Sequence, residues 1–336
     1  MLMYKWTFVA IIVLFISCGG GKNKPDVSGI DVDVTLKRFE QDFFKIDTNN
    51  VVQGLVSLQK AHPQFYPVFM QDILQLPPTG AEAMSIIKTI VSSYRSLNDS
   101  IQKKYPSMDW LQQDLEQNFK YVKYYFPNYK LPNIVTFIGT LDAPGAVLTP
   151  SHLGIGLHQY AGKNFSAYQD AQVQQMYPAY ISRRFDKEYM VVNGLRAIAD
   201  DLYPDQSVGR PLIEQMVEKG KAWYLLSHLA PDAADSAITG YTTAQLEWAD
   251  NNEGNIWGHV IKTENIYSIE PHVIQTYIGE SPFTQGMPQQ SPGNLGQWIG
   301  WRIVQQYAGK NKELTLQQVL EAPAKAIFEG AQYRPK

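Results

Sequence analysis

The chain has 336 residues, a formal net charge of −3 at pH 7 and a single cysteine. Hydrophobic residues make up 44% of the sequence and aromatic residues 12%, which is ample for a large hydrophobic core. One cysteine excludes a disulfide framework, so the core must supply the stability. The sequence contains no basic block, which argues against a nucleic-acid partner and against attraction of the folded part to anionic lipid.

The N-terminus has the features of a lipoprotein signal peptide. Trp6–Ile16 is apolar except for Thr7, and it is too short for a bilayer, which needs about 20 residues, but suited to a secretory signal. Phe15-Ile16-Ser17-Cys18 resembles the lipobox of bacterial lipoproteins, in which the cysteine becomes acylated. We expect Cys18 to carry two or more acyl chains, because one chain anchors a protein only weakly. The alternative is an ordinary signal peptide with an incidental thiol.

A polar, glycine-rich stretch follows the cysteine and is typical of a flexible tether. We therefore expect residues 1–17 to be the signal peptide, 18–29 the lipidated cysteine and tether, and 30–336 a single globular domain. The expected location is the periplasmic side of the cell envelope, with the outer membrane favoured over the inner membrane.

The folded part opens with two short predicted elements. An alternating pattern over Ile30–Leu36 predicts a strand, and an amphipathic pattern over Arg38–Ile46 predicts a short helix. Apolar residues at helical spacing then predict a series of helices, separated by prolines and polar residues. These helices cover 51–61, 65–74, 81–94, 96–105 and 108–126.

The hydrophobic period next changes from that of a helix to that of a strand. Strands are predicted over Asn133–Gly139, Gly145–Thr149 and His152–Gln159, as a small antiparallel sheet. His152 and His158 face the same way on the third strand, but positions so spaced lie roughly 20 Å apart, so one metal ion cannot bridge them. We interpret both histidines as exposed polar residues at the ends of an edge strand.

Helical patterns resume in the second half of the chain. The predicted helices cover 170–185, 187–202, 210–229, 231–237, 242–264, 271–278, 294–308, a segment capped by Thr315, and 323–330. Thr242 and Thr315 each precede a glutamine at the spacing of a capping box. Glu214, Glu218 and Lys221 share the polar side of their helix, so we expect them to be solvated. The predicted fold class is α+β, mainly helical with one small antiparallel sheet.

Two aromatic helices, 242–264 and 294–308, are expected to form the wall on which the other elements pack. Their tryptophans recur at helical spacing, and aromatic pairs of this kind usually belong to a core. Gly296 and Gly300 leave room for a neighbouring helix, which we expect to be 242–264.

Glu253 is the strongest candidate for a binding site, because it falls on the apolar stripe of its helix. A carboxylate there must be paired, protonated or facing a cleft, since burying a bare charge is too costly. The candidate cleft comprises Asn252, Glu253, Trp257 and Trp298, with indole rings able to stack on sugars. The competing interpretation is a buried carboxylate held for structural reasons by an arginine or a helix N-terminus.

The order of small sheet, helix and long helix is that of zinc-peptidase domains, whose metal helix carries H-E-x-x-H. The corresponding helix reads Val191-Val192-Asn193-Gly194-Leu195-Arg196-Ala197, with Asn, Gly and Ala where His, Glu and His would stand. None of the six histidines recurs at the spacing i, i+4. We therefore expect no metal, no cofactor and no catalytic residue.

Several motifs resemble those of the gliding-motility lipoprotein GldB family. They are the lipobox, Gly154–Gly162, Asp200–Pro204, Gly240–Thr242, Trp248-Ala249, Asn252-Glu253, Ile256-Trp257, Pro282–Thr284, and Ser291–Gly293 with Gly296–Trp301. The last group is the most specific, and the resemblance covers nearly the whole chain. The chain is also distantly similar to predicted zinc peptidases with an intact metal helix, which implies a zincin-like fold that has lost its metal.

The resemblance implies a lipid-anchored cell-envelope protein that supports surface gliding by protein–protein contact and is not an enzyme. Its expected partners are membrane lipid, through acylated Cys18, and envelope proteins of a motility machinery. The alternative is an envelope hydrolase or peptidoglycan-binding module that uses the Glu253 cleft. The sequence leaves open which protein is the partner, whether the anchor lies in the inner or the outer membrane, the oligomeric state, and whether the chain is an assembly factor or a permanent component.

Overall fold

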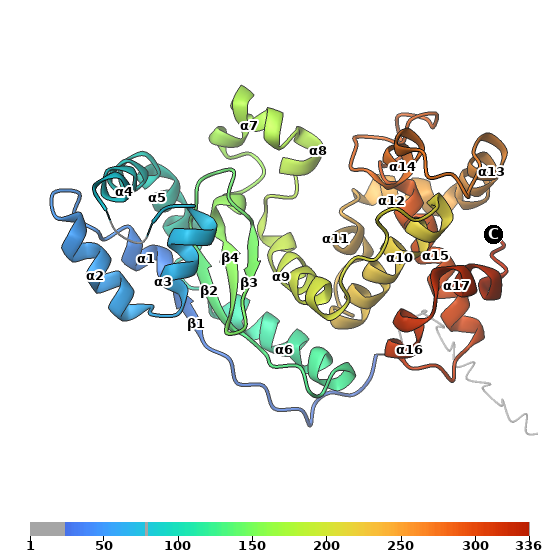
Figure 1. The fold of residues 1–336 in the computed structure, drawn as a ribbon, viewed down its shortest axis with the longest axis horizontal. Coiled ribbons are helices and arrows are strands. Elements are labelled where there is room, and N and C mark those ends of the chain that lie inside the picture. Colours follow the sequence, from blue (N-terminus) through green and yellow to red (C-terminus); the bar gives the residue numbers. More distant parts are fainter. Residues whose placement is uncertain (1–23, 78–79, 336) are drawn as a thin grey trace, which may run out of the picture.

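The computed structural model describes residues 24–77 and 80–335 (Figure 1). The signal peptide over 1–17 and the acylation site Cys18 lie outside the described residues. Within them the chain is mainly helical with one small sheet, so the predicted α+β class is confirmed. No helix in the described part of the chain has both the length and the apolar character needed to cross a membrane.

The sheet has four strands and is mixed, so the expected antiparallel sheet was wrong. The strands are β1 (Leu36–Arg38), β2 (Asn133–Phe137), β3 (Ala146–Leu148) and β4 (His152–Gly156), in the order β1-β2-β4-β3. β2 pairs in parallel with β1 and β4, and only β3 and β4 pair antiparallel. Residues 138–151 form the long connection that a parallel pair requires, and β3 lies within it. The period of a strand does not reveal which neighbour it pairs with.

His158 shows the consequence of this strand order. β4 lies between β2 and β3, so it is not an edge strand. The chain leaves β4 after Gly156 and forms a short 3-10 turn over Leu157–Gln159. His158 lies in this turn and is fully buried, whereas His152 is partly exposed. The expected solvent exposure of His158 was therefore wrong.

An aromatic cluster joins the sheet to the first helices. Phe39, Phe65, Phe69 and Phe137 are all buried, and the Phe39 and Phe69 ring centroids lie 4.6 Å apart. The expected helix over 65–74 continues from an α-helical turn into a π-helix, Val68–Ile73. The other helices of this part are α1 (Phe39–Phe43), α2 (Val51–Ala61), α3 (Phe65–Pro67), α4 (Ala81–Ser93) and α5 (Arg95–Lys104).

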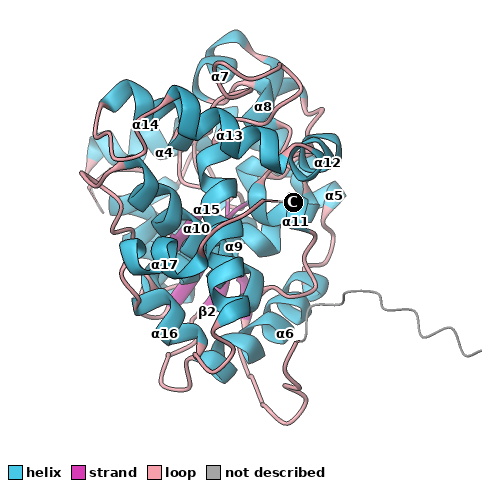
Figure 2. Cartoon of the chain, turned by 90° about the vertical axis from the view of Figure 1, so that its right-hand side faces the viewer, coloured by secondary structure: helices cyan, strands magenta, loops and turns pink. Residues whose placement is uncertain are grey.

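Helix α9 (Lys187–Leu202) lies at the centre of the molecule, between the sheet and the C-terminal helices (Figure 1). It contacts β3 and β4 on one side, and α6 (Asp109–Tyr125), α10 (Leu212–Leu229) and α11 (Asp235–Thr239) on the others. A Cβ at Gly194 would lie 3.0 Å from Ile155 Cδ1, so the glycine permits the close approach of α9 to the sheet. Seen from the side, helices cover the strands (Figure 2).

Two expected long helices are interrupted. The predicted helix over 170–185 is split at Tyr177, because Pro178 disfavours a helical backbone in the residue before it. The predicted helix over 242–264 is two helices that meet at Asn252. The remaining helices are α7 (Ala171–Met176), α8 (Ala179–Ser182), α12 (Thr243–Asn251), α13 (Glu253–Thr263), α14 (Pro271–Ile278), α15 (Leu295–Lys310), α16 (Leu316–Glu321) and α17 (Ala324–Ala331).

The closest helix pair is α10 with α15, which corrects the expected neighbour of Gly300. A Cβ at Gly300 would overlap the carbonyl of Met216, and one at Gly220 would overlap the backbone of Gly300. The two glycines therefore allow the helix backbones to touch. The wall on which other elements pack is α10 with α15, not the 242–264 segment with α15.

The expectation that the polar side of α10 is solvated was wrong for Glu218 and Lys221. α9, α15, α16 and α17 all contact α10, so Glu218 and Lys221 are buried. Lys221 Nζ donates to Glu218 Oε1 (3.1 Å), Tyr203 Oη (3.0 Å) and the carbonyl of Ala322 (2.7 Å). Burial lowers the pKa of Lys221, while Glu218 acts to raise it. These bonds satisfy the ammonium inside the protein.

Candidate functional site

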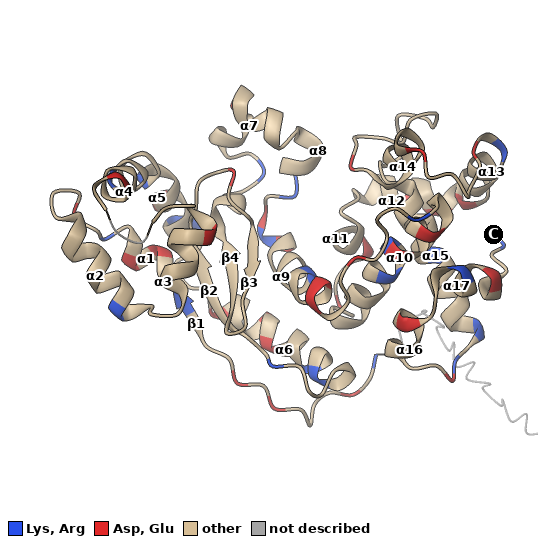
Figure 3. Ribbon diagram, in the orientation of Figure 1, with Lys and Arg blue, Asp and Glu red and all other residues tan. Residues whose placement is uncertain are grey.

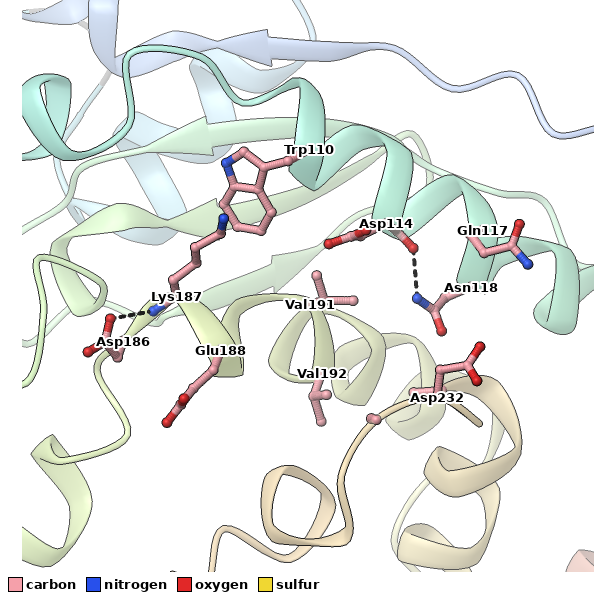
Figure 4. Close-up of a pocket in the computed structure, with 12 residues that line it drawn as sticks. Trp110, Asp114, Gln117, Asn118, Asp186, Lys187, Glu188, Val191, Val192 and Asp232 are labelled. Atoms are coloured by element: carbon pink, nitrogen blue, oxygen red, sulfur yellow. Dashed lines mark hydrogen bonds between the residues drawn. The ribbon is translucent and has the colours of Figure 1, made fainter. Parts of the chain in front are cut away.

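A groove runs along the N-terminal half of α9 (Figure 4). Its first part has a volume of about 680 Å³ and lies between α6, α9 and the segment that joins α10 to α11. A second hollow of about 530 Å³ shares Glu188, Val192 and Ala233 with the first and continues toward Tyr241. We call the two together the α9 groove. The first part is lined by Trp110, Asp114, Gln117, Asn118, Asp186, Lys187, Glu188, Val191, Val192, Ala230, Asp232 and Ala233.

The floor of the α9 groove is aliphatic and its rim is charged. Val191 and Val192 come from the first turns of α9, and Ala230 and Ala233 face them from beyond the end of α10. Asp186 caps α9, since its side chain accepts a hydrogen bond from the backbone N–H of Lys187. The charged rim therefore comes from the start of α9 and the body of α6, and the aliphatic floor comes from the first turns of α9 and the segment after α10.

Three lysines of the chain itself already occupy cation sites in this groove. Lys187 Nζ lies 4.0 Å from the centroid of the Trp110 ring, within the range of a cation–π contact (Figure 4). Lys104 Nζ lies 2.9 Å from Asp186 Oδ1, and Lys24 Nζ lies 2.7 Å from Asp232 Oδ1. Burial acts to raise the pKa of Asp186, but the hydrogen bonds from Lys104 and from the Lys187 backbone outweigh it and lower that pKa.

Two rim carboxylates remain without such a partner. Asp114 and Glu188 are exposed, and neither side chain forms an ion pair or hydrogen bond with the residues that the structure describes. Elsewhere in the molecule, positions of Lys and Arg and of Asp and Glu are scattered over the helices (Figure 3). The arrangement combines an indole ring, an aliphatic floor and free carboxylates, and these groups are suited to binding.

The residues proposed from the sequence lie in a different place, around the C-terminal tail. Glu253 is 6% exposed, and its carboxylate accepts hydrogen bonds from Arg302 Nη2 (3.1 Å) and Tyr333 Oη (2.6 Å). This geometry matches the competing interpretation of a carboxylate tied to an arginine. The Trp257 ring packs on Tyr333 at 5.5 Å between centroids.

The other two members of the proposed cleft also have structural contacts. Trp298 lies in the core and is 1% exposed, and Arg302 Cζ lies 5.7 Å from the centroid of its ring. The Asn252 side-chain amide donates to the carbonyl of Trp248 (2.8 Å) at the end of α12. The structure thus brings the four residues into one region, where Tyr333 and Arg302 fill the space around Glu253. A ligand-binding role for them stays a prediction.

The helix that corresponds to the metal helix of zinc peptidases is α9. Val191 and Val192 line the groove there, and Asn193 Nδ2 donates to Tyr160 Oη (3.0 Å). Across residues 24–77 and 80–335, no group of three or more His, Cys, Asp or Glu side chains is placed to hold a metal ion. The zincin-like arrangement stays a prediction.

Sequence reasoning missed the α9 groove, although it singled out the helix that forms its floor. Trp110 and Asp114 lie on α6, far from α9 in the sequence, and nothing in the pattern of α6 distinguishes them from an ordinary solvated face. The N-cap Asp186 followed by Lys187 and Glu188 was the available signal. It marks a charged helix start beside an aliphatic turn.

Fold and groove together define a mainly helical α+β protein with an open, charged groove close to the start of its folded part. The family described as gliding motility protein GldB matches residues 20–335, so the chain belongs to this family. It is therefore a gliding-motility-associated lipoprotein of the cell envelope. A search of curated proteins and a search of solved structures each found no significant match.

Proposed function

We propose that this protein is anchored by acylated Cys18 and acts by binding other envelope proteins of the gliding machinery, without catalysing a reaction. The observation that carries the proposal is the position of the α9 groove relative to the tether. Lys24, which opens the described chain, forms an ion pair with Asp232 on the groove rim. Five residues separate Lys24 from Cys18, so the two Cα atoms lie at most about 22 Å apart when this chain is fully extended. The groove would then open close to the bilayer surface.

The composition of the groove supports a protein ligand. Tryptophan is enriched where proteins bind one another, and Trp110 is only partly buried. The aliphatic floor offers apolar area, and the rim offers charges that select a partner. The alternative, a hydrolase or peptidoglycan-binding module that uses Glu253, is favoured by no observation, because Arg302 and Tyr333 already engage that carboxylate.

The anchor is tested by Cys18→Ala in the native host, followed by metabolic labelling with a fatty-acid probe. We expect the label to be lost, because the acyl acceptor is gone. Ser28→Ala, a change within the tether, serves as the control and should keep its label. Label that persists in the Cys18→Ala protein contradicts the anchor.

The binding role is tested by a photo-reactive amino acid placed at Val191 on the groove floor. Val56, an exposed valine on α2, is the matched control position. In gliding cells we expect the Val191 probe to crosslink one envelope protein that the Val56 probe does not capture. Crosslinking at Val56 alone contradicts the choice of site, and hydrolysis of envelope material by the purified protein contradicts the non-catalytic role.

A further inference from the structure

We infer that the α9 groove takes an extended segment of a partner protein that presents a lysine or arginine to Asp114 and Glu188. This inference rests on the proposed function and names the chemistry of its partner. The chain's own lysines show how side chains of this groove bind a cation. Lys24 binds Asp232, Lys104 binds Asp186, and Lys187 stacks on Trp110, so each of these features already holds a cation.

The two free carboxylates determine the charge of the ligand that the groove accepts. Asp114 and Glu188 rise from α6 and α9 on either side of the aliphatic floor. A lysine or arginine can lay its methylene stem along Val191 while its charged end reaches a carboxylate. A metal ion fits less well, because the described residues offer no group of three acidic or histidine ligands.

The length of the groove favours a segment of chain over a single amine. The hollow of about 680 Å³ continues past Glu188 into the second hollow of about 530 Å³. The far part contributes Lys163 and Arg183, so the groove changes charge from acidic to basic along its length. An extended backbone can span both parts and place its basic residue at the acidic end, which sets its direction.

The test uses the mature acylated protein in detergent micelles and two labelled glycine–serine peptides, one with two lysines and one with two glutamines in their place. Fluorescence anisotropy measures both affinities. We expect the lysine peptide to bind about tenfold more tightly at low salt, and the difference to shrink as salt screens the charges. Equal affinities overturn the inference.

The variant Asp114→Asn/Glu188→Gln isolates the two carboxylates. We expect it to lose most of the preference for the lysine peptide, because neither amide attracts a cation. The control variant Glu82→Gln/Glu247→Gln removes the same charge from exposed positions on α4 and α12 and should bind as the wild type does. Matching thermal unfolding curves show that each variant is folded. An unchanged preference in Asp114→Asn/Glu188→Gln overturns the inference.

The crosslinking experiment separates this inference from the proposed function. When the Val191 probe is combined with Asp114→Asn/Glu188→Gln, we expect the crosslinked product to fall about tenfold. A product that persists at full yield overturns the cationic ligand and leaves the protein-binding role standing. If the otherwise unchanged protein gives no crosslinked product with either the Val191 or the Val56 probe, both are overturned.

Discussion

At the scale of single residues, a helix cap forms from contacts within one turn, whereas the burial of a side chain depends on elements far away in the chain. The capping boxes begun by Thr242 and Thr315 are both present, because each depends only on residues within one helical turn. The burial of His158 depends instead on which strand lies beside β4. No local pattern carries that information.

His158 is held as a neutral ring by its surroundings. Nδ1 accepts a hydrogen bond from the backbone N–H of Gly139 (3.2 Å), so the proton lies on Nε2, which donates to the carbonyl of Ala143 (3.0 Å). Burial is the main cause that lowers the pKa of His158 from 6.5 to about 4. A charged imidazole in this place would be poorly solvated and would oppose the Gly139 donor.

This pKa predicts a loss of stability in mild acid. Above about pH 6.5 the ring is neutral in both the folded and the unfolded chain; as the pH falls toward about 4, only the unfolded chain takes up the proton. The free energy of unfolding should therefore fall by about 3 kcal/mol over this window on account of His158. Urea unfolding across the window measures the slope. His158→Gln, which does not titrate, should show a shallower slope, and parallel curves for the two proteins would refute the prediction.

At the scale of elements, helix positions followed from the sequence more closely than helix partners. Helices α9 and α14 have the predicted bounds, because apolar spacing and caps mark them. The neighbour of Gly300 was misassigned, since a pair of glycines on one face of a helix indicates a close contact but does not identify the other helix. The α9 groove was likewise not predicted, because α6, α9 and the α10–α11 segment come together only in the folded chain.

The crossing of α10 and α15 gives a prediction with a control in the same helix. Gly300→Val should lower the free energy of unfolding by about 3 kcal/mol, because its side chain would collide with the backbone at Met216 and the helices must separate. Gly309→Ala lies in α15 where nothing comes within 4 Å, so it should be neutral or gain up to about 1 kcal/mol from helix propensity. Urea unfolding reads out both. Equal stabilities would show that the two helices are not in backbone contact.

At the scale of the whole molecule, α9 connects the two parts of the fold. Its side chains belong to one continuous hydrophobic cluster that extends from Val34, before β1, to Tyr333 in the C-terminal tail. Arg196 of α9 also donates to the carbonyl of Ile238 in α11 (2.8 Å). With the core shared in this way, the sheet cannot lose its packing without exposing α9, and α9 cannot move without exposing α10.

We therefore predict that the sheet and the C-terminal helices unfold in a single cooperative transition. Tryptophan fluorescence reports mainly on the C-terminal part, where Trp298 and Trp301 are buried. Hydrogen exchange of peptides from β2 and β4 reports on the sheet. Across a urea series the two midpoints should coincide, and Gly300→Val, which touches only α10 and α15, should shift both by the same amount. If the β2 and β4 peptides become exchangeable at a lower urea concentration than that at which the tryptophan fluorescence changes, the chain consists of two domains connected by α9. The α9 groove would then change shape when the two domains move.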